Sequence, residues 1–376
     1  MKQYLTFEWF LILSLLMVAS CEFSPVDYAA ETGEFLAGGD ISALGKMEDM
    51  GAVYRDNDKP GDAITIMRNH GANCFRLRLF VKPTGEGMVV QDIAYTIALA
   101  KRIKAVGAKI MLDFHYSDTW ADPGKQHKPN AWIEYSLTEL EQAVYEHTRE
   151  SIAAMKKAGV TPELVQVGNE IDNGMLWPDG RVSHGDNVNN TPKQYDQLAR
   201  LLKAGIRGVR DGAPGEDVTT IIHAAGGGKW DKIQHYYKSL LERGVEFDMI
   251  GLSNYPWWQG NISHQRQVFE NLARTFKKPI ISVEVAFLHR IQHNRKLTQW
   301  LNDGLNEYPI SPEGQKRYME AFVRMVRETP NGLGMGAIWW FPESIPLGDF
   351  KNWQSGAAAM FDGQGNALPV LDAFQP

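Results

Sequence analysis

The sequence predicts a single (β/α)8 TIM barrel, a closed ring of parallel strands with a helix after each strand. Strand-like apolar runs alternate with helix-like amphipathic runs along most of the 376 residues. No long linker or low-complexity tract divides the chain, and its length suits an eight-unit barrel with elaborated loops. Two apolar runs also deliver glutamates near their carboxyl ends, where such barrels carry catalytic groups.

Taken in order, the apolar runs predict strands at residues 35–41, 73–80, 108–114, 164–167, 219–223, 249–253, 279–285 and 335–340. Apolar residues three or four apart predict helices between them, including residues 92–106, 137–158, 192–210, 230–243, 262–276 and 313–328. Gly107, Gly159 and Gly244 follow helix ends, where a left-handed residue is favoured. The polar stretches at residues 56–62, 179–191 and 211–217 are expected to be loops and turns within one domain.

The first residues are expected to lie outside the barrel. Residues 10–19 form an apolar segment behind Lys2 that is too short to span a bilayer and is typical of a signal peptide. Residues 18–21 (VASC) resemble a lipobox, in which the cysteine becomes the lipidated first residue. We therefore expect a lipoprotein signal peptide over 1–20, a tether over 21–34 and the catalytic barrel over 35–376. Cys21 would then hold an exported protein on the cell envelope, at the outer membrane or cell surface; ordinary secretion is the alternative.

Composition excludes several classes of partner. The formal charge of −6, the pI near 6.0 and the absence of any Lys/Arg run argue against nucleic-acid binding. If Cys21 is lipidated, Cys74 has no disulfide partner and is expected to be a small buried residue. No zinc or phosphate-loop spacing is present, and the glycines at 226–228 predict a loop near the cleft. We expect a monomer without a cofactor.

Two glutamates indicate the chemistry. In LVQVGNEIDNG (164–174) an apolar run ends in Asn169 and Glu170, and in PIISVEVAF (279–287) Glu284 lies within an apolar run. A buried carboxylate is costly unless it is paired or functional. The fourth and seventh strands lie three apart in an eight-strand ring, so the two side chains can meet, as a retaining glycosidase requires. Glu170 is then the acid/base and Glu284 the nucleophile, while Asn169 can contact the sugar's 2-hydroxyl. Capping of the next segment is the alternative for Asn169 and Glu170.

Distinctive motifs cover essentially the whole chain after the signal peptide: LDFHYSDTWADPG (112–124), VQVGNEIDNG (165–174), IGLSNYPWW (250–258), VEVAF (283–287) and IWWFP (338–342). Together they resemble glycoside hydrolase family 53, the arabinogalactan endo-β-1,4-galactanases. The resemblance implies endo-hydrolysis of β-1,4-linked galactan in pectic type I arabinogalactan. A mannanase or glucanase of the same clan is the nearest alternative, and a non-catalytic polysaccharide-binding surface lipoprotein is a more distant one.

The resemblance also implies roles for single residues. Arg78 matches an arginine that keeps the nucleophile charged, with Arg76 as the competing choice, and Tyr255 resembles a tyrosine that hydrogen-bonds the nucleophile. The other candidates for sugar contact are His115, Asp118, Trp120, Trp257, Trp258 and Trp340. Packing in the core is the alternative for each tryptophan, and packing at a strand end for His115.

The chain departs from the family pattern at three places. Asn254 and Phe341 replace residues of the common SYYPWW and WEP motifs, which leaves the reaction unaffected but bears on subsite preference. Many bacterial members bind calcium in the loops after the last two strands. Here the stretch after Glu284 is basic and has no carboxylate before Asp303, whereas calcium prefers oxygen ligands. We expect the calcium site to be absent or altered.

Overall fold

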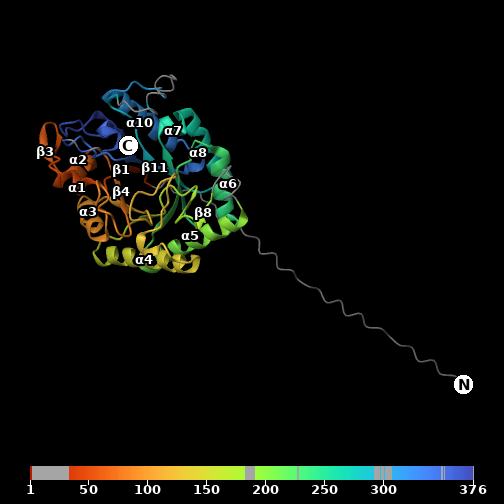
Figure 1. The fold of residues 1–376 in the computed structure, drawn as a ribbon. Helices are drawn as coiled ribbons and strands as arrows, with labels where there is room; N and C mark the ends of the chain where they lie inside the picture. Colours follow the sequence, from red (N-terminus) through yellow and green to blue (C-terminus); the bar gives the residue numbers. More distant parts are fainter. Residues whose placement is uncertain are drawn as a thin grey trace.

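In the computed structural model, eight parallel strands close into a barrel in the order β1-β12-β11-β10-β9-β6-β5-β4 (Figure 1). The structure describes residues 1, 34–182, 191–226, 228–291, 297, 300, 307–348, 350 and 352–375. Apart from Met1, the predicted signal peptide lies outside these ranges, as do Cys21 and all but the last residue of the tether. The barrel strands are β1 (Leu36–Asp40), β4 (Cys74–Leu79), β5 (Lys109–Phe114), β6 (Leu164–Val167), β9 (Thr219–Ala224), β10 (Met249–Asn254), β11 (Ile280–Val285) and β12 (Gly334–Trp340). The eight predicted strands are confirmed.

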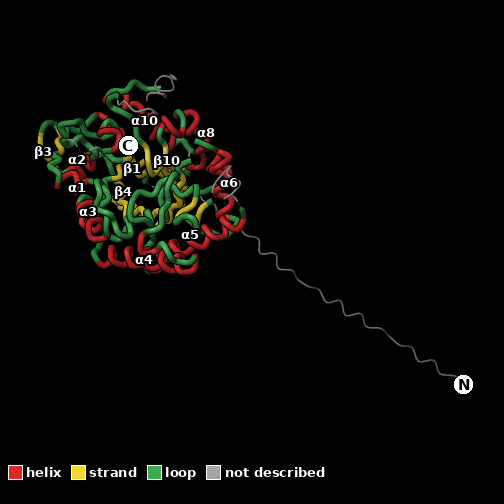
Figure 2. Tube along the Cα trace, in the orientation of Figure 1, coloured by secondary structure: helices red, strands yellow, loops and turns green. Residues whose placement is uncertain are grey.

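Helices surround the ring of strands (Figure 2). The longer ones are α3 (Ile93–Ala105), α4 (Leu137–Lys157), α5 (Pro192–Gly212), α6 (Trp230–Leu241), α8 (Ile262–Phe276) and α10 (Pro312–Arg327). Their starts follow from local chemistry, because Ser136 and Glu139 form a capping box at α4 and Asp92 caps α3. Gly107, Gly159 and Gly244 have φ values of 69°, 74° and 64°, as predicted for residues just past helix ends. No helix in the described part of the chain is long and apolar enough to cross a membrane.

Shorter elements decorate the barrel. They are α1 (Leu44–Asp49), α2 (Ala63–Asn69), α7 (Pro256–Gln259), the two-stranded sheets β2 (Tyr54–Asp56) with β3 (Lys59–Gly61) and β7 (Gly174–Met175) with β8 (Gly180–Arg181), and 3-10 turns at Asn130–Trp132, Pro330–Gly332, Trp353–Gly356 and Pro369–Phe374. The turn expected within residues 56–62 is confirmed, and two short strands that were not expected flank it. Asn57 and Asp58 take positive φ values and turn the chain into a hairpin, after which Asp62 caps α2.

The barrel interior changes character along its axis. Its lower part is a separate apolar cluster to which every strand contributes: Leu36, Cys74, Met111, Leu164, Ile221, Met249, Ile281, Val283 and Ile338. Side chains two residues further along a strand return to the same face, one layer nearer the carboxyl ends. Several of those positions hold buried polar groups, including Arg76 after Cys74, Asp113 after Met111 and His223 after Ile221. The sheet therefore supports a polar site on an apolar base.

The register of β11 is irregular beside Glu284. Along β10, Leu252 pairs with Ser282 but the next residue, Ser253, pairs with Glu284, so Val283 is an extra residue in β11. The same extra residue is present relative to β12. A bulge of this kind re-aims the side chains that follow it. Here it places Glu284 opposite Ser253.

Candidate active site

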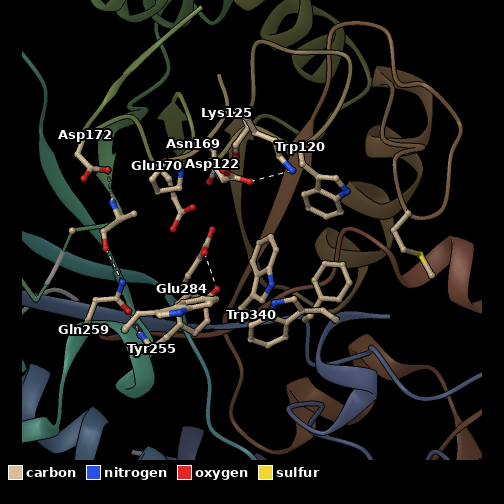
Figure 3. A pocket seen from close by; sticks show the side chains of 18 of the residues that line it. Trp120, Asp122, Lys125, Asn169, Glu170, Asp172, Tyr255, Gln259, Glu284 and Trp340 are labelled. Atoms are coloured by element: carbon tan, nitrogen blue, oxygen red, sulfur yellow. Dashed lines mark hydrogen bonds and ion pairs between the residues drawn. The ribbon is translucent and has the colours of Figure 1, made fainter. Parts of the chain in front are cut away.

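A cleft of about 900 Å³ opens at the carboxyl ends of the barrel strands. Glu170 follows β6 by three residues, Glu284 lies in β11, and both line this cleft. Figure 3 shows their carboxylates pointing toward one another across it. The two predicted glutamates therefore share one cavity, as the chemistry of a glycosidase requires.

Glu170 is held in an unusual backbone conformation. Its φ is 49°, a left-handed value that a residue with a side chain adopts only when its surroundings impose it. Its N–H donates to His223 Nδ1 at 3.2 Å, and the next N–H, that of Ile171, donates to the His223 carbonyl at 2.9 Å. Gln126 Nε2 donates to the carbonyls of Asn169 and Glu170. These bonds fix the direction in which the acid enters the cleft.

Glu284 is held by one hydrogen bond and one ion pair. Tyr255 Oη donates to Glu284 Oε2 at 2.8 Å, as predicted, and Arg76 Nη2 lies 3.2 Å from Oε1. The preference for Arg78 as the nucleophile's partner is therefore wrong. Both arginines face the barrel interior because they are two residues apart on β4, but Arg78 lies one layer higher and pairs with Asp40 at 3.1 Å.

Two distances from the Ser253 hydroxyl limit how far apart the two carboxylates can be. Ser253 Oγ lies 2.7 Å from Glu170 Oε1 and 3.4 Å from Glu284 Oε2. Those two oxygens are therefore at most about 6 Å apart, below the ~6.5–9.5 Å separation of inverting enzymes and compatible with the ~5–5.5 Å of retaining ones.

The surroundings separate the proton affinities of the pair. Burial and the nearby Glu284 charge raise the pKa of Glu170 well above its usual range. Burial also raises the pKa of Glu284, to about 7, but Arg76 and Tyr255 oppose the rise because they stabilise its charged form. Glu170 thus retains its proton more strongly than Glu284, which is the order that an acid and a nucleophile need.

Arg76 is the centre of a buried charge network beneath the pair. Its guanidinium contacts Asp40 and Asp113, each at 2.8 Å, in addition to Glu284. Its Nη2 also donates to Asn169 Oδ1 at 2.7 Å. Asn169 lines the cleft, with Nδ2 donating to the carbonyl of Ala121, and its contact with the sugar's 2-hydroxyl stays a prediction. A rigid fork of donors thereby orients the amide and the nucleophile together.

Aromatic side chains form the walls of the cleft. Trp120, Trp258 and Trp340 line it, so all three are placed where a bound sugar could reach them, and their contact with sugar stays a prediction. Trp257 does not; it is buried between Tyr255, with ring centroids 5.6 Å apart, and Trp300, at 6.1 Å. The prediction of a sugar platform at Trp257 is corrected to a core contact, because the first turn of α7 directs Trp258 outward and Trp257 inward.

Two other predicted sugar contacts lie behind the wall rather than in it. His115 Nδ1 accepts from the N–H of Ala121, and Nε2 lies 3.1 Å from Asp113, so this side chain braces the loop that carries Trp120. Asp118 accepts from the backbone N–H groups of Lys82 and Asn130. Neither residue lines the cleft. Arg78 is also behind it, with its guanidinium 4.5 Å from the Trp120 ring centroid.

Comparison with known proteins identifies the family. A family model described as Glycosyl hydrolase family 53 matches residues 36–374, which is nearly the whole described chain. The chain belongs to glycosyl hydrolase family 53. Among its relatives, an arabinogalactan endo-β-1,4-galactanase of Cellvibrio japonicus is 32% identical and matches over 92% of each chain. A protein of Niallia circulans without an assigned activity is 38% identical over 91% of this chain and 93% of its own.

Solved structures agree with the assignment to family 53. The catalytic domain of a family 53 protein of Ignisphaera aggregans superimposes with a TM-score of 0.82 at 32% identity, covering 91% of this chain and 96% of that one. A structure from a study of two fungal β-1,4-galactanases gives a TM-score of 0.78 at 30% identity, with 90% and 98% covered. The match extends over the whole barrel and not only over the catalytic strands.

The departures from the family 53 pattern lie in different places. Phe341 lines the cleft and has a φ of 58°, whereas Asn254 is fully buried and does not line it. Only Phe341 is therefore positioned to affect subsite preference. Within the described ranges no cluster of three His, Cys, Asp or Glu side chains could hold a metal ion. Because part of the 287–302 segment lies outside those ranges, the expected loss of the calcium site stays a prediction.

Sequence reasoning missed three polar residues of the site. Gln166, His223 and Ser253 are buried on the inner face of β6, β9 and β10, directly beneath the carboxylates. The signal was present, because each directly follows an apolar run: Gln166 follows Leu-Val, His223 follows Ile-Ile, and Ser253 follows Met-Ile-Gly-Leu. Only the alignment of the strands shows that all three meet.

Proposed function

We propose that this family 53 protein is an endo-β-1,4-galactanase that cleaves the galactan of type I arabinogalactan with retention of configuration. The shared cleft position of Glu170 and Glu284, linked through the Ser253 hydroxyl, carries the proposal of a retaining mechanism. The substrate is supported by the named galactanases among its relatives, including that of Cellvibrio japonicus.

The geometry supports a double displacement. In the first step a Glu284 oxygen bonds to the anomeric carbon while Glu170 gives its proton to the departing glycosidic oxygen. Arg76 and Tyr255 hold Glu284 ionised and directed at the sugar until that bond forms. In the second step water attacks the same carbon, Glu170 takes the water's proton, and the bond to Glu284 breaks.

The substrate can be tested by digestion of galactan, mannan and barley glucan with purified protein. We expect oligosaccharides from galactan; their absence together with products from another polysaccharide would move the assignment to a mannanase or glucanase. Proton NMR of the first products tests retention, because they should carry the β configuration before mutarotation. Binding to galactan without any products would favour the non-catalytic surface protein instead.

The location proposed for the enzyme is the cell envelope. The lipobox-like residues at 18–21 and the preceding apolar segment support export and lipidation at Cys21. Replacement of Cys21 by serine should release the protein from the membrane fraction and remove incorporated fatty acid. Retention of both would refute the anchor.

A further inference from the structure

A chain of buried hydrogen bonds connects the charge network of Arg76 to the acid Glu170. It begins at Gln166, whose amide orientation is set by charged neighbours: Oε1 accepts from Arg76 Nε at 3.2 Å and Nε2 donates to Asp113 Oδ1 at 2.6 Å. The opposite orientation would place the amide N–H groups against the guanidinium and the oxygen against the carboxylate. Gln166 Nε2 is therefore a donor.

This donor determines the tautomer of His223. Gln166 Nε2 lies 3.0 Å from His223 Nδ1, and the backbone N–H of Glu170 points at the same atom from 3.2 Å. Asn169 Oδ1, an acceptor, also lies 3.2 Å from Nδ1, but the Glu170 N–H can only donate, and a hydrogen on Nδ1 would point against it. Two donors directed at Nδ1 require it to be unprotonated, and burial keeps the ring neutral because it lowers the pKa of His223 well below its usual range. The ring hydrogen is consequently on Nε2.

The tautomer in turn determines the direction of the Ser253 hydroxyl. His223 Nε2 lies 2.9 Å from Ser253 Oγ and, carrying the hydrogen, must donate to it. The hydroxyl then uses its own hydrogen toward Glu170 Oε1, at 2.7 Å, in preference to Glu284 Oε2 at 3.4 Å. A carboxyl oxygen that accepts this bond cannot also direct its own proton at Ser253.

We propose that Ser253 and His223 are positioning residues that keep the catalytic proton of Glu170 on Oε2. No residue in the described ranges hydrogen-bonds Oε2, and the Glu170 side chain lines the cleft, so a proton on this oxygen is available to a glycosidic oxygen. In the second step the same arrangement leaves Oε2 free to take the proton of the attacking water. The inference rests on the proposed function and specifies how its acid is prepared.

The test compares two substrates that differ in their need for an acid. Galactan has a poor leaving group that must be protonated, whereas a nitrated phenyl β-1,4-galactotrioside releases a stable phenolate with little help. Ser253→Ala should lower kcat/KM on galactan by roughly 10- to 100-fold, a part of the ~10²–10⁴ that general acid catalysis contributes, and change kcat/KM on the aryl glycoside by less than about 3-fold. His223→Met, which removes the donor to Ser253, should show the same selective loss, and His223→Gln should retain more activity because it keeps an N–H donor.

Ser239→Ala is the matched control, since it removes another buried serine hydroxyl from α6, outside the cleft. Equal losses on both substrates would overturn the proposal, because Ser253 would then support the nucleophile Glu284 or the folding of the protein. Unchanged activity on galactan would overturn the proposal as well. The melting temperature of each variant shows whether it is correctly folded. If Ser253→Ala is poorly folded, the two His223 variants test the proposal. If the wild-type protein cleaves the aryl glycoside but not galactan, the proposed substrate is refuted and not the role of Ser253. The variants would then be compared on the aryl glycoside and on the polysaccharide that the wild-type protein does cleave.

Discussion

Replacement of Tyr255 by phenylalanine should make the nucleophile harder to ionise. The change removes the 2.8 Å hydrogen bond from Tyr255 Oη to Glu284 Oε2 and leaves the ring in place. A buried hydrogen bond to a charged group contributes about 1.5–3 kcal/mol. Because one pKa unit corresponds to about 1.4 kcal/mol, the pKa of Glu284 should rise by roughly 1–2 units from its value of about 7.

The direction of the change in the pKa of Glu284 can be measured from the pH dependence of kcat/KM. The reactive form of Glu284 is the carboxylate, so activity is lost as pH falls through its pKa. A higher pKa moves the acidic limb of the profile toward higher pH. At pH 7 about half of the wild-type molecules but only about a tenth or less of the variant molecules would have the carboxylate ionised, so kcat/KM should fall roughly 5- to 50-fold, with partial recovery at higher pH.

Tyr145→Phe is the matched control, since its hydroxyl bonds Asp211 on the outside of the barrel. It should leave the profile unchanged. The two glutamates titrate as a coupled pair, so the positions of both limbs are to be fitted together. An acidic limb that stays in place in Tyr255→Phe, or moves to lower pH, would refute the role of this hydroxyl in stabilising the ionised nucleophile.

Three further predictions follow from the site and the fold. Glu284→Ala should abolish turnover but leave galactan binding, measured by affinity electrophoresis, largely intact, because the nucleophile stabilises the transition state more than the bound substrate; unchanged turnover would remove Glu284 from the mechanism. Gly174→Ala should destabilise the protein by at least about 2 kcal/mol and lower the melting temperature by several degrees, because φ is 85° and the new Cβ would lie 1.9 Å from the Gly180 carbonyl oxygen, while Gly363→Ala, in open space, should have little effect. Dialysis against a calcium chelator should leave the melting temperature unchanged, and a fall that added calcium reverses would contradict the expected loss of that site.

The barrel could be predicted from the sequence because its strands and helices have different hydrophobic periods. The runs at 164–167 and 219–223 are short and apolar, and the segment at 137–158 shows a helical pattern with a serine cap. The hairpin at β2 and β3 was missed because its strands are three residues each and carry mostly polar or exposed side chains. Such a turn is identified by its backbone conformation, which composition reflects only weakly.

The catalytic pair could be predicted, but the residues that orient it could only partly be assigned. Arg76 and Arg78 share a face of β4, so alternation does not distinguish them; the choice depends on their height in the barrel, which depends on how β4 aligns with β11. Trp257 and Trp258 are adjacent in a short helix, and the sequence alone does not show which of them faces the cleft. His115 and Asp118 lie in a highly specific motif, yet their contacts support the loop instead of lining the cleft. A motif identifies the family without separating supporting side chains from those that touch sugar.

The extra residue in β11 has a practical consequence for anyone who wishes to transplant this chemistry. In a designed strand with regular pleating, consecutive side chains face opposite sides of the sheet. A glutamate placed directly after an inward-facing valine, as Glu284 follows Val283, would therefore point at the surrounding helices. The irregular backbone must be copied together with the side chain.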